Sequence, residues 1–494
     1  MLLSEYLQRY VNMNLNVNKL VTDHILENVY DNSKNVSNNS VFVAINGYSK
    51  SGLVFINEAI KNGALTIIYD DENYRYNKDK YPKINFIYVS SSKVELARLL
   101  KIINKDKKMP NLIGITGTNG KTTVTNIVYE CLKNSNINTL LIGTEGIKSY
   151  YDGKEEYFNS VNTTPSISEL YKYIYLHNYV FVVMEVSSQG IIEGRVLGLK
   201  FKLICLTNIT QDHLDYHKTI DNYANAKARL AINLDVSDYL VINNNSDYAN
   251  LFINSTIAKL ITYNDGYNKR YSNYTGRIIN RYYNKMDIVI WDNKNCYEIT
   301  TNLCGDFNVQ NILASYSILK TLKIDKEVIL NTLKTFKPVI GRMNYYLLNK
   351  DRINKHIIID YAHTPDGIQQ VLNYYNNVKH KKIKVVIGCG GNRDKSKRAL
   401  IGNIVSKNAD FVYLTEDNSR NEKTIDIIED IKKGLNDNNY QVILSRKQAI
   451  ESAINESNDG DIILILGKGA EQFIISDKKN PFSDIIFVES LLYE

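Results

Sequence analysis

The sequence predicts an α/β fold in three domains: a small N-terminal α/β domain, a central parallel sheet of the phosphate-loop ATPase type and a Rossmann-like C-terminal domain. Short apolar stretches of strand length alternate with helical stretches along most of the chain, as a parallel sheet requires. A glycine-rich loop with a lysine follows one of these stretches. The chain has 494 residues, too many for one ordinary core.

Two prolines indicate the domain boundaries, because the chain contains only six. Pro110 follows a polar run, Asn104–Lys108, and immediately precedes an apolar stretch. Pro338 follows a helical stretch. We therefore expect domains at residues 1–109, 110–337 and 338–494.

Each domain has its own predicted strands and helices. The first contains strands at 40–45 and 65–69 with a helix at 55–62 between them. The middle domain has predicted strands at 111–116, 139–143, 179–186, 203–208 and 239–243, a β-meander at 278–299 and helices at 122–133 and 308–323. The third domain has predicted strands at 357–360, 383–387, 411–414, 442–444 and 462–466.

Composition limits the kinds of partner. The net charge is +7, with both signs interspersed and no block of five or six like charges, so we expect no nucleic acid. The surplus of positive charge is compatible either with binding of anionic small substrates or with an ordinary solvated surface that carries charges of both signs. Five scattered cysteines without a C-x-x-C pair indicate a reducing compartment, and no stretch of 18 apolar residues predicts a membrane span. We expect a cytoplasmic monomer.

The loop after the strand at 111–116 is predicted to bind the phosphates of ATP. It consists of Gly117, Thr118, Asn119, Gly120, Lys121, Thr122 and Thr123. Backbone N–H groups and the positive end of the following helix point at one spot there, and a threonine hydroxyl can reach Mg²⁺ on the phosphates. Ile115 stands where the strict P-loop has its first glycine. The alternative is a plain strand-to-helix turn.

Polar residues gather at the carboxyl ends of two further predicted strands, where open α/β sheets bind ligands. Glu185 follows the apolar stretch Val180–Met184, and Asp212, His213 and His217 come after the stretch Leu203–Leu206. We expect these side chains to converge on the phosphate loop and to hold Mg²⁺. For His213, the alternative is a structural histidine.

Five separated strings together resemble the Mur ligase family, and within it the MurE branch of UDP-N-acetylmuramoyl-tripeptide synthetases. The strings are Gly117–Thr123, Glu185–Ser188, Asn208–His213, Asp360–Pro365 and Gly388–Asp394. The resemblance covers nearly the whole chain. It implies that ATP phosphorylates the terminal carboxylate of UDP-MurNAc-L-Ala-D-Glu, and that the amine of a diamino acid attacks the acyl phosphate.

The resemblance also assigns roles to single residues. Lys121, Glu185, His213 and Lys227 are expected to be catalytic, with Mg²⁺ held by Thr122, Glu185, His213 and a carbamylated Lys227. Without the resemblance, Lys227 would be predicted on a helix surface. ATP would also contact Asn308, Arg342 and Asp360, although Asn308 alone suggests a helix cap. The nucleotide peptide would contact Ser33, Asn162, Thr163, Thr164, Ser187, Glu193 and Arg195.

The incoming amino acid is predicted from the string Asp417–Glu422, which resembles the signature of enzymes that add meso-diaminopimelate. Arg420 can bind the distal carboxylate that lysine lacks. The expected contacts are Arg393, Asp417, Asn418, Ser419, Arg420, Gly467 and Glu471. Ser419 and Ala470 depart from the family's proline and histidine, and Glu193 and Gln189 from its usual glutamine and histidine.

Three alternatives remain at this stage. The chain could add L-lysine instead of meso-diaminopimelate. It could be a related ATP-dependent amide ligase that acts on another acid. It could also be a noncatalytic nucleotide-binding partner of cell-wall assembly, although such a protein would not need Lys121, Glu185, His213 and Lys227 together.

Overall fold

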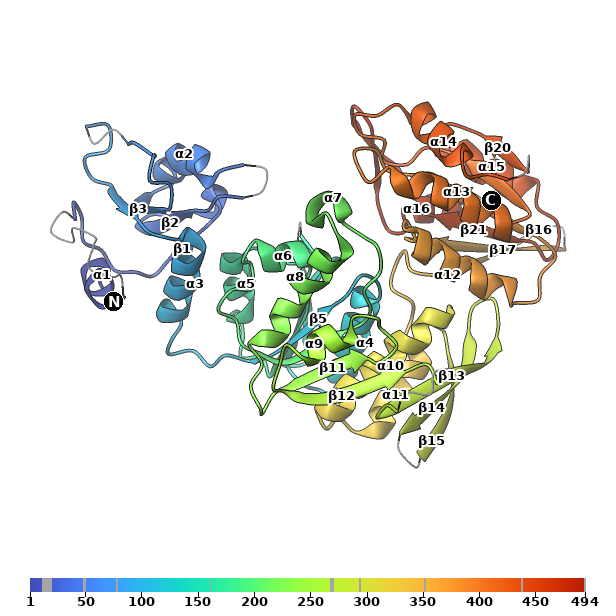
Figure 1. Cartoon of the computed structure of the whole chain (residues 1–494), viewed down its shortest axis with the longest axis horizontal. Coiled ribbons are helices and arrows are strands. Elements are labelled where there is room, and N and C mark those ends of the chain that lie inside the picture. Colours follow the sequence, from blue (N-terminus) through green and yellow to red (C-terminus); the bar gives the residue numbers. More distant parts are fainter. Residues whose placement is uncertain are drawn as a thin grey trace. The chain divides into compact units, whose positions relative to one another are not determined.

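We describe a computed structural model of the chain, which divides into two compact units (Figure 1). The structure describes residues 1–10, 20–47, 50–76, 79–160, 162–266, 271–292, 295–350, 352–436 and 439–492. The first unit contains Met1–Gly114 and Ile137–Lys202, and the second contains Ile115–Asn136 and Leu203–Glu494. The domain boundaries predicted from Pro110 and Pro338 stay predictions. Among the described residues, no helix is both long and apolar enough to cross a membrane.

The first unit begins with a four-stranded parallel sheet in the order β1-β2-β3-β4. Its core lies between β2, β3 and α2, where Phe42, Ile56 and Ile67 are buried. The elements of this part are α1 (Leu3–Tyr10), β1 (Val29–Tyr30), η2 (Ser33–Asn35), β2 (Ser40–Ala44), η3 (Gly52–Phe55), α2 (Ile56–Lys61), β3 (Ala64–Tyr69), β4 (Asn85–Tyr88) and α3 (Ser92–Ile103).

The rest of the first unit contains strands in the order β9-β6-β7-β8. Strands β9 and β6 are parallel, whereas β6, β7 and β8 pair in antiparallel fashion. The hairpin β7–β8 was not predicted, because the residues of β8 are mostly exposed and form no apolar run. The elements are β6 (Thr139–Gly143), β7 (Gly146–Tyr151), β8 (Lys154–Phe158), α5 (Ile167–Ile174), β9 (Phe181–Glu185) and α6 (Ser188–Ile192).

Two strands contain residues of both units: β5 (Asn111–Thr116) and β10 (Phe201–Leu206). In the second unit, β10, β11, β12 and β13 pair in parallel, and β13, β14 and β15 form the predicted antiparallel meander, of which residues 293–294 lie outside the described ranges. The sheet is therefore mixed, with parallel strands followed by the antiparallel meander. The elements are α4 (Lys121–Asn134), α7 (Leu214–His217), α8 (Ile220–Ile232), β11 (Tyr239–Asn243), α9 (Ala249–Ile253), β12 (Lys259–Asn264), β13 (Tyr274–Arg281), β14 (Met286–Asp292), β15 (Asn295–Thr301), α10 (Asp306–Thr321) and α11 (Lys326–Thr335).

The last part of the second unit is a six-stranded sheet in the order β16-β17-β21-β18-β19-β20, which is parallel except for the edge strand β16. A small hairpin, β22–β23, follows it. The elements are β16 (Asn344–Lys350), β17 (Ile353–Asp360), α12 (Pro365–Asn376), β18 (Ile383–Ile387), α13 (Ser396–Asn408), β19 (Phe411–Leu414), α14 (Thr424–Lys432), β20 (Tyr440–Val442), α15 (Arg446–Asn455), β21 (Ile462–Leu466), β22 (Phe473–Ile475), β23 (Lys479–Pro481) and α16 (Asp484–Leu492).

Helices cover this sheet (Figure 1). On one face, Ile357, Val386 and Ile463 pack against Ile450 of α15 and Val488 of α16. Every residue of the central strands β18 and β21 is buried. Successive side chains of a strand point to opposite faces of the sheet, so both faces are covered at these strands. Loops at the carboxyl ends of β17, β18, β19 and β21 are therefore the places where polar side chains can gather.

Candidate active site

The phosphate loop joins β5 to α4 through two glycines with positive φ, 145° at Gly117 and 86° at Gly120. A Cβ at Gly117 would lie 1.9 Å from Thr207 Oγ1, and one at Gly120 would lie 2.2 Å from Asn311 Oδ1. The loop therefore requires glycine at both positions. Its backbone is held by Asn208, whose carbonyl accepts from Thr118 N at 2.8 Å and whose side chain accepts from Asn119 N at 2.9 Å.

Lys121 begins α4 and folds back over this loop. Its ammonium donates to the backbone oxygens of Gly117 and Thr118, each at 2.9 Å. Thr122 and Thr123, in the first turn of α4, are both buried. The loop thus combines a glycine-lined concavity, a helix of 14 residues and a cation, and this combination fits a polyphosphate.

Lys227 is 1% exposed, so a position on the surface of α8 is excluded. Its Nζ donates to Gly117 O at 2.9 Å and lies 4.7 Å from the centroid of the Tyr223 ring. Burial, together with the nearby charge of Lys121, lowers the pKa of Lys227 well below its usual value, although Asp212 opposes the shift. The structure therefore brings the predicted catalytic lysines Lys121 and Lys227 to the same loop carbonyl.

The histidines after β10 differ in their surroundings. His213 has φ of 53°, and its Nε2 lies 3.4 Å from Asp212 Oδ2. Burial raises the pKa of Asp212, but the charges of His213, His363 and Lys121 outweigh it, so that this pKa is lowered. The buried ring of His217 contacts the Tyr216 and Tyr223 rings.

The predicted metal site draws Glu185 from the first unit and Asp212, His213 and His217 from the second, so it stays a prediction. Within the described ranges, no three His, Cys, Asp or Glu side chains come together as a metal site. His217 is engaged with tyrosine rings, and Glu185 belongs to the first unit. A hard cation such as Mg²⁺ prefers oxygen donors; among the four predicted ligands, Thr122 and Glu185 have them, and Lys227 has them only once it carries a carboxylate. The donor set fits Mg²⁺ only in that form.

Three further residues were predicted to contact ATP. Asn308 is buried in α10, where Asn311 Nδ2 donates to its Oδ1 at 2.8 Å. It is not the helix cap, because Gly305 occupies that position. The guanidinium of Arg342 lies 4.5 Å from the Tyr361 ring centroid. Burial raises the pKa of Asp360, although the Arg342 charge opposes this shift, and its carboxylate accepts from Met343 N at 2.8 Å.

In the first unit, hydrogen bonds link several of the predicted nucleotide-peptide contacts. Glu185 accepts from Thr144 N at 2.9 Å, and Thr144 Oγ1 lies 3.0 Å from Thr163 Oγ1. The Thr164 hydroxyl donates to Glu185 O and accepts from Ser187 N, at 3.1 and 3.0 Å. The end of β9 and the start of α6 therefore meet the loop that carries the two threonines.

A pocket in the same unit is lined by Glu193 and Arg195, whose side chains form an ion pair of 2.5 Å. Sequence reasoning missed its other lining residues, which are Asp31, Ile45, Asn46, Gly47, Lys93, Ser166, Ile167 and Gly194. Ser33 does not line this pocket, since its hydroxyl donates to Glu58 Oε2. Asn162 is exposed and lies outside it as well.

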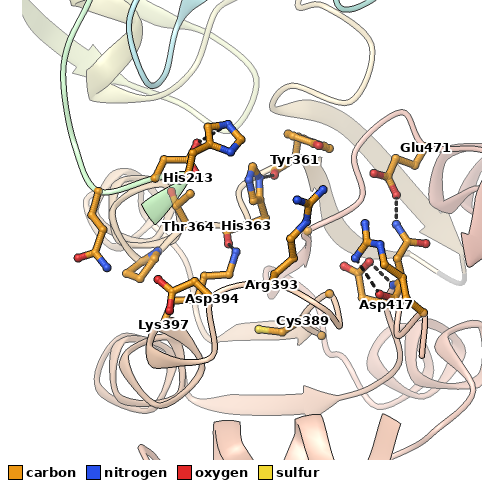
Figure 2. Close-up of a pocket in the computed structure, with 18 residues that line it drawn as sticks. His213, Tyr361, His363, Thr364, Cys389, Arg393, Asp394, Lys397, Asp417 and Glu471 are labelled. Carbon is orange, nitrogen blue, oxygen red and sulfur yellow. Dashed lines mark hydrogen bonds and ion pairs between the residues drawn. The ribbon is translucent and has the colours of Figure 1, made fainter. Parts of the chain in front are cut away.

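A second pocket lies at the carboxyl ends of β17, β18, β19 and β21 (Figure 2). It is lined by all but one of the predicted amino-acid contacts, namely Arg393, Asp417, Asn418, Arg420, Gly467 and Glu471. Ser419 is the exception, because it is buried with its backbone oxygen against Gly391. Figure 2 shows the Arg393 side chain between His363 and Asp417.

Arg420 has a backbone φ of 54°, and its Nη1 donates to Gly391 O at 2.8 Å and to Asn418 O at 3.2 Å. These bonds fix its side chain between the loops after β18 and β19, at the wall of the pocket. Sequence reasoning missed Tyr361, His363, Cys389, Asp394 and Lys397, which also line it. For Tyr361, His363 and Cys389, the position directly after a strand end was the signal that could have identified them, whereas Asp394 and Lys397 lie further along the chain.

Comparison with known proteins gives the family context. Residues 115–319 match the Mur ligase middle domain, and residues 341–469 match the Mur ligase glutamate ligase domain. The chain is similar to two proteins named UDP-N-acetylmuramoyl-L-alanyl-D-glutamate--2,6-diaminopimelate ligase. The one from Clostridium tetani is 34% identical over 95% of each chain, and the second such ligase of Clostridium acetobutylicum is 36% identical over 94% of this chain and 95% of its own.

Solved structures agree with this context. A structure of a UDP-N-acetylmuramoyl-L-alanyl-D-glutamate--2,6-diaminopimelate ligase is 26% identical, covers 95% of each chain and has a TM-score of 0.65. A MurF ligase from Thermotoga maritima in complex with ADP shares the fold, with a TM-score of 0.62 over 91% of this chain and 94% of its own at 18% identity.

Proposed function

The chain belongs to the Mur ligase family, and from this membership we propose that it joins meso-diaminopimelate to UDP-MurNAc-L-Ala-D-Glu at the expense of ATP. The observation that carries the choice of amino acid is the pocket after β17, β18, β19 and β21. Its wall combines two arginines, Arg393 and Arg420, with Asn418 and Glu471. Guanidinium groups suit the carboxylates of diaminopimelate, and a carboxylate suits an ammonium group.

The reaction needs an activated acid, because a carboxylate is a poor acyl donor. The terminal carboxylate of the nucleotide peptide attacks the γ-phosphorus of ATP, which gives an acyl phosphate and ADP. The amine of the diamino acid then attacks the acyl carbon, loses its proton and expels phosphate as the amide forms. The protein contributes mainly positioning and charge neutralisation.

The residues of the phosphate loop have distinct tasks in this proposal. The N–H groups at the start of α4 bind the β- and γ-phosphates. Lys121 turns from the carbonyls of Gly117 and Thr118 to the γ-phosphate, where it offsets the negative charge that develops during transfer. Mg²⁺ held by Thr122, Glu185, His213 and carbamylated Lys227 would supply further charge neutralisation.

The pocket of the first unit has the composition expected for the nucleotide peptide. Arg195 is fixed by its ion pair with Glu193 and by a bond of 2.7 Å from its Nη1 to Thr164 O. Asp31 accepts hydrogen bonds from Ser166 and Ser168. Ser33 is assigned to this substrate only by resemblance, and its hydroxyl donates to the Glu58 carboxylate.

The proposal is tested with purified protein, ATP, Mg²⁺ and UDP-MurNAc-L-Ala-D-Glu, to which meso-diaminopimelate or L-lysine is added separately. We expect phosphate release and a tripeptide product of the corresponding mass with meso-diaminopimelate. Product with L-lysine alone would assign the chain to the lysine-adding enzymes. Absence of product with both amino acids, from folded protein that binds ATP, would contradict the proposed function.

A further inference from the structure

Two residues that line the pocket at the ends of β17, β18, β19 and β21 are hydrogen-bonded to a buried lysine, Lys468. Lys468 is 0% exposed and lies in the turn after β21. Its ammonium donates to Phe473 O at 2.7 Å, to Glu471 Oε2 at 2.9 Å and to Asn418 Oδ1 at 3.4 Å. An ammonium group has three N–H donors, so each has an acceptor. A charge buried in this way requires such partners, because an unpaired buried charge is strongly destabilising.

The partners of Lys468 belong to two different loops. Glu471 follows β21, whereas Asn418 follows β19, and their side chains meet through a bond of 2.7 Å from Asn418 Nδ2 to Glu471 Oε2 (Figure 2). Asn418 Oδ1 also accepts from Ile475 N at 2.8 Å. Lys468 thus joins the two loops and the hairpin β22–β23 at a single point.

The geometry leaves one oxygen of Glu471 for a ligand. Oε2 accepts from both Lys468 and Asn418, whereas Oε1 has no hydrogen-bond donor among the described residues. The Glu471 side chain is 35% exposed and lines the pocket. An anchored carboxylate with one open oxygen is suited to accept a hydrogen bond from an ammonium group.

We propose that Lys468 is a positioning residue for the amino-acid substrate, which fixes the Glu471 carboxylate so that its free oxygen can accept from an ammonium group of the diamino acid. This inference rests on the proposed function. Lys468 acts through Glu471 and does not touch the substrate. Other charged or titratable groups near Glu471 are Asp417, Tyr361 and Arg446, and the charge of Arg446 is balanced by Asp484 at 2.8 Å.

The consequence is that Lys468 contributes only while Glu471 is present. In Lys468→Met, Glu471 loses its charged donor and can rotate, so the KM for the diamino acid should rise by about ten- to hundredfold. The KM values for ATP and for the nucleotide peptide should stay unchanged. Glu471→Gln should raise the same KM, and the double variant should be no worse than Glu471→Gln alone, because interactions within one network are not additive.

Lys384→Met is the matched control. Lys384 is also a buried lysine of this sheet, but it lies on β18 and donates to the backbone oxygen of Glu456. It should lose stability without a change in any KM. Thermal unfolding of all variants distinguishes weaker folding from weaker positioning. If Lys468→Met does not fold, Lys468→Gln is measured in its place, because its amide keeps two of the three N–H donors without the charge.

Three results would overturn the inference: an unchanged KM for the diamino acid, equal increases in the KM values of all three substrates, or effects of Lys468→Met and Glu471→Gln that multiply in the double variant. Failure of the proposed function is a separate result. In that case, the unsubstituted protein makes no amide from either diamino acid.

Discussion

The ammonium of Lys227 and the carbonyl of Gly117 are joined by a hydrogen bond of 2.9 Å beneath the phosphate loop. The lysine is 1% exposed, and its pKa is lowered well below the usual value, first by burial and then by the charge of Lys121. A lowered pKa favours the neutral amine, and only the neutral amine can attack CO₂ to form a carbamate. The lowered pKa leaves more of the neutral amine that carbamylation requires, and the modification that the family resemblance assigns to Lys227 stays a prediction.

Lys227→Ala should lose most of the ligase activity, by about 10²- to 10³-fold, because it removes the side chain that would carry the carboxylate near the phosphates. Added acetate or formate should restore part of the activity by placing a carboxylate in the vacated space. Amide formation is measured with and without these acids. Arg229→Ala, at an exposed position of the same helix, is the control. Full activity of Lys227→Ala would remove carbamylation from the mechanism.

Gly117→Ala should abolish tight ATP binding. The new Cβ would lie 1.9 Å from Thr207 Oγ1 and 2.9 Å from Asn208 O, at a φ of 145° that alanine rarely adopts. The loop must shift, and its N–H groups then no longer converge on the phosphates. ATP affinity is measured by calorimetry, together with thermal unfolding.

Gly153→Ala is the matched control for this substitution. Gly153 also has a positive φ, 75°, but a Cβ there would meet no atom within 4 Å. Both variants should unfold more readily because of backbone strain, whereas only Gly117→Ala should lose ATP affinity. Equal ATP affinity in the two variants would show that the glycine is not needed for phosphate binding.

Much of the fold could be predicted because its buried strands are apolar runs. The strands β11, β18 and β21 have the predicted bounds, since every residue of β18 and β21 is buried. The hairpin strand β8 was missed because it is mostly exposed and its sequence does not alternate apolar and polar residues. The strand β16 was missed for a similar reason. It lies at the edge of its sheet, where it pairs only with β17, and most of its residues are only half-buried, so it does not form an apolar run.

The candidate site was predicted less completely. The family resemblance identified Arg393, Asn418 and Arg420, all of which line one pocket. The burial of Lys227 could not be predicted, because a lysine between two alanines in a helical stretch is typical of a surface. Lys468 was missed because its importance lies in contacts with Asn418, which is 50 residues away in the sequence.

Arg420→Ala should weaken the binding of meso-diaminopimelate far more than that of ATP. Arg420 lines the pocket, and its guanidinium is held by Gly391 O and Asn418 O, so it is fixed in place to bind a carboxylate. Loss of a charge-assisted pair should raise the KM for the diamino acid by about ten- to hundredfold. Steady-state kinetics with each substrate varied in turn measures this difference.

Arg352→Ala is the control for replacing an arginine at a position with positive φ. Arg352 also has a positive φ, 66°, but it is exposed in the turn between β16 and β17. Its replacement should leave every KM unchanged. If Arg420→Ala raised the KM values of ATP and the diamino acid equally, Arg420 would be a residue of the fold and not of the amino-acid site.

The loops that carry Arg393 and Arg420 are tied together by an ion pair between Arg398 and Glu422. The Arg398 side chain is 1% exposed, and both of its terminal nitrogens donate to Glu422, each at 3.0 Å. Glu422 also accepts from the backbone N–H of Asn392. Hydrogen bonding to Arg398 lowers the pKa of Glu422 from 4.5 to about 2, against the opposing effect of burial.

This shift predicts how stability depends on pH. The pKa of Glu422 is lower in the folded chain than in the unfolded chain, so the pair stabilises the fold fully above pH 4.5 and less as the pH falls toward 2. Glu422→Gln should therefore lower the free energy of unfolding at pH 7 by about 1 to 2 kcal/mol, allowing for solvent screening. The difference between the two proteins should shrink below pH 4.5.

Urea unfolding at several pH values between 3 and 7 measures this difference. Glu429→Gln is the control, because Glu429 pairs with Lys432 on the surface of α14 and should contribute little at any pH. The Arg398 charge keeps a second partner, Asp430, at 3.0 Å, so the loss in Glu422→Gln should be partial and the chain should still fold. A difference independent of pH would mean that Glu422 stabilises the loops by packing and backbone hydrogen bonding, and not by its charge.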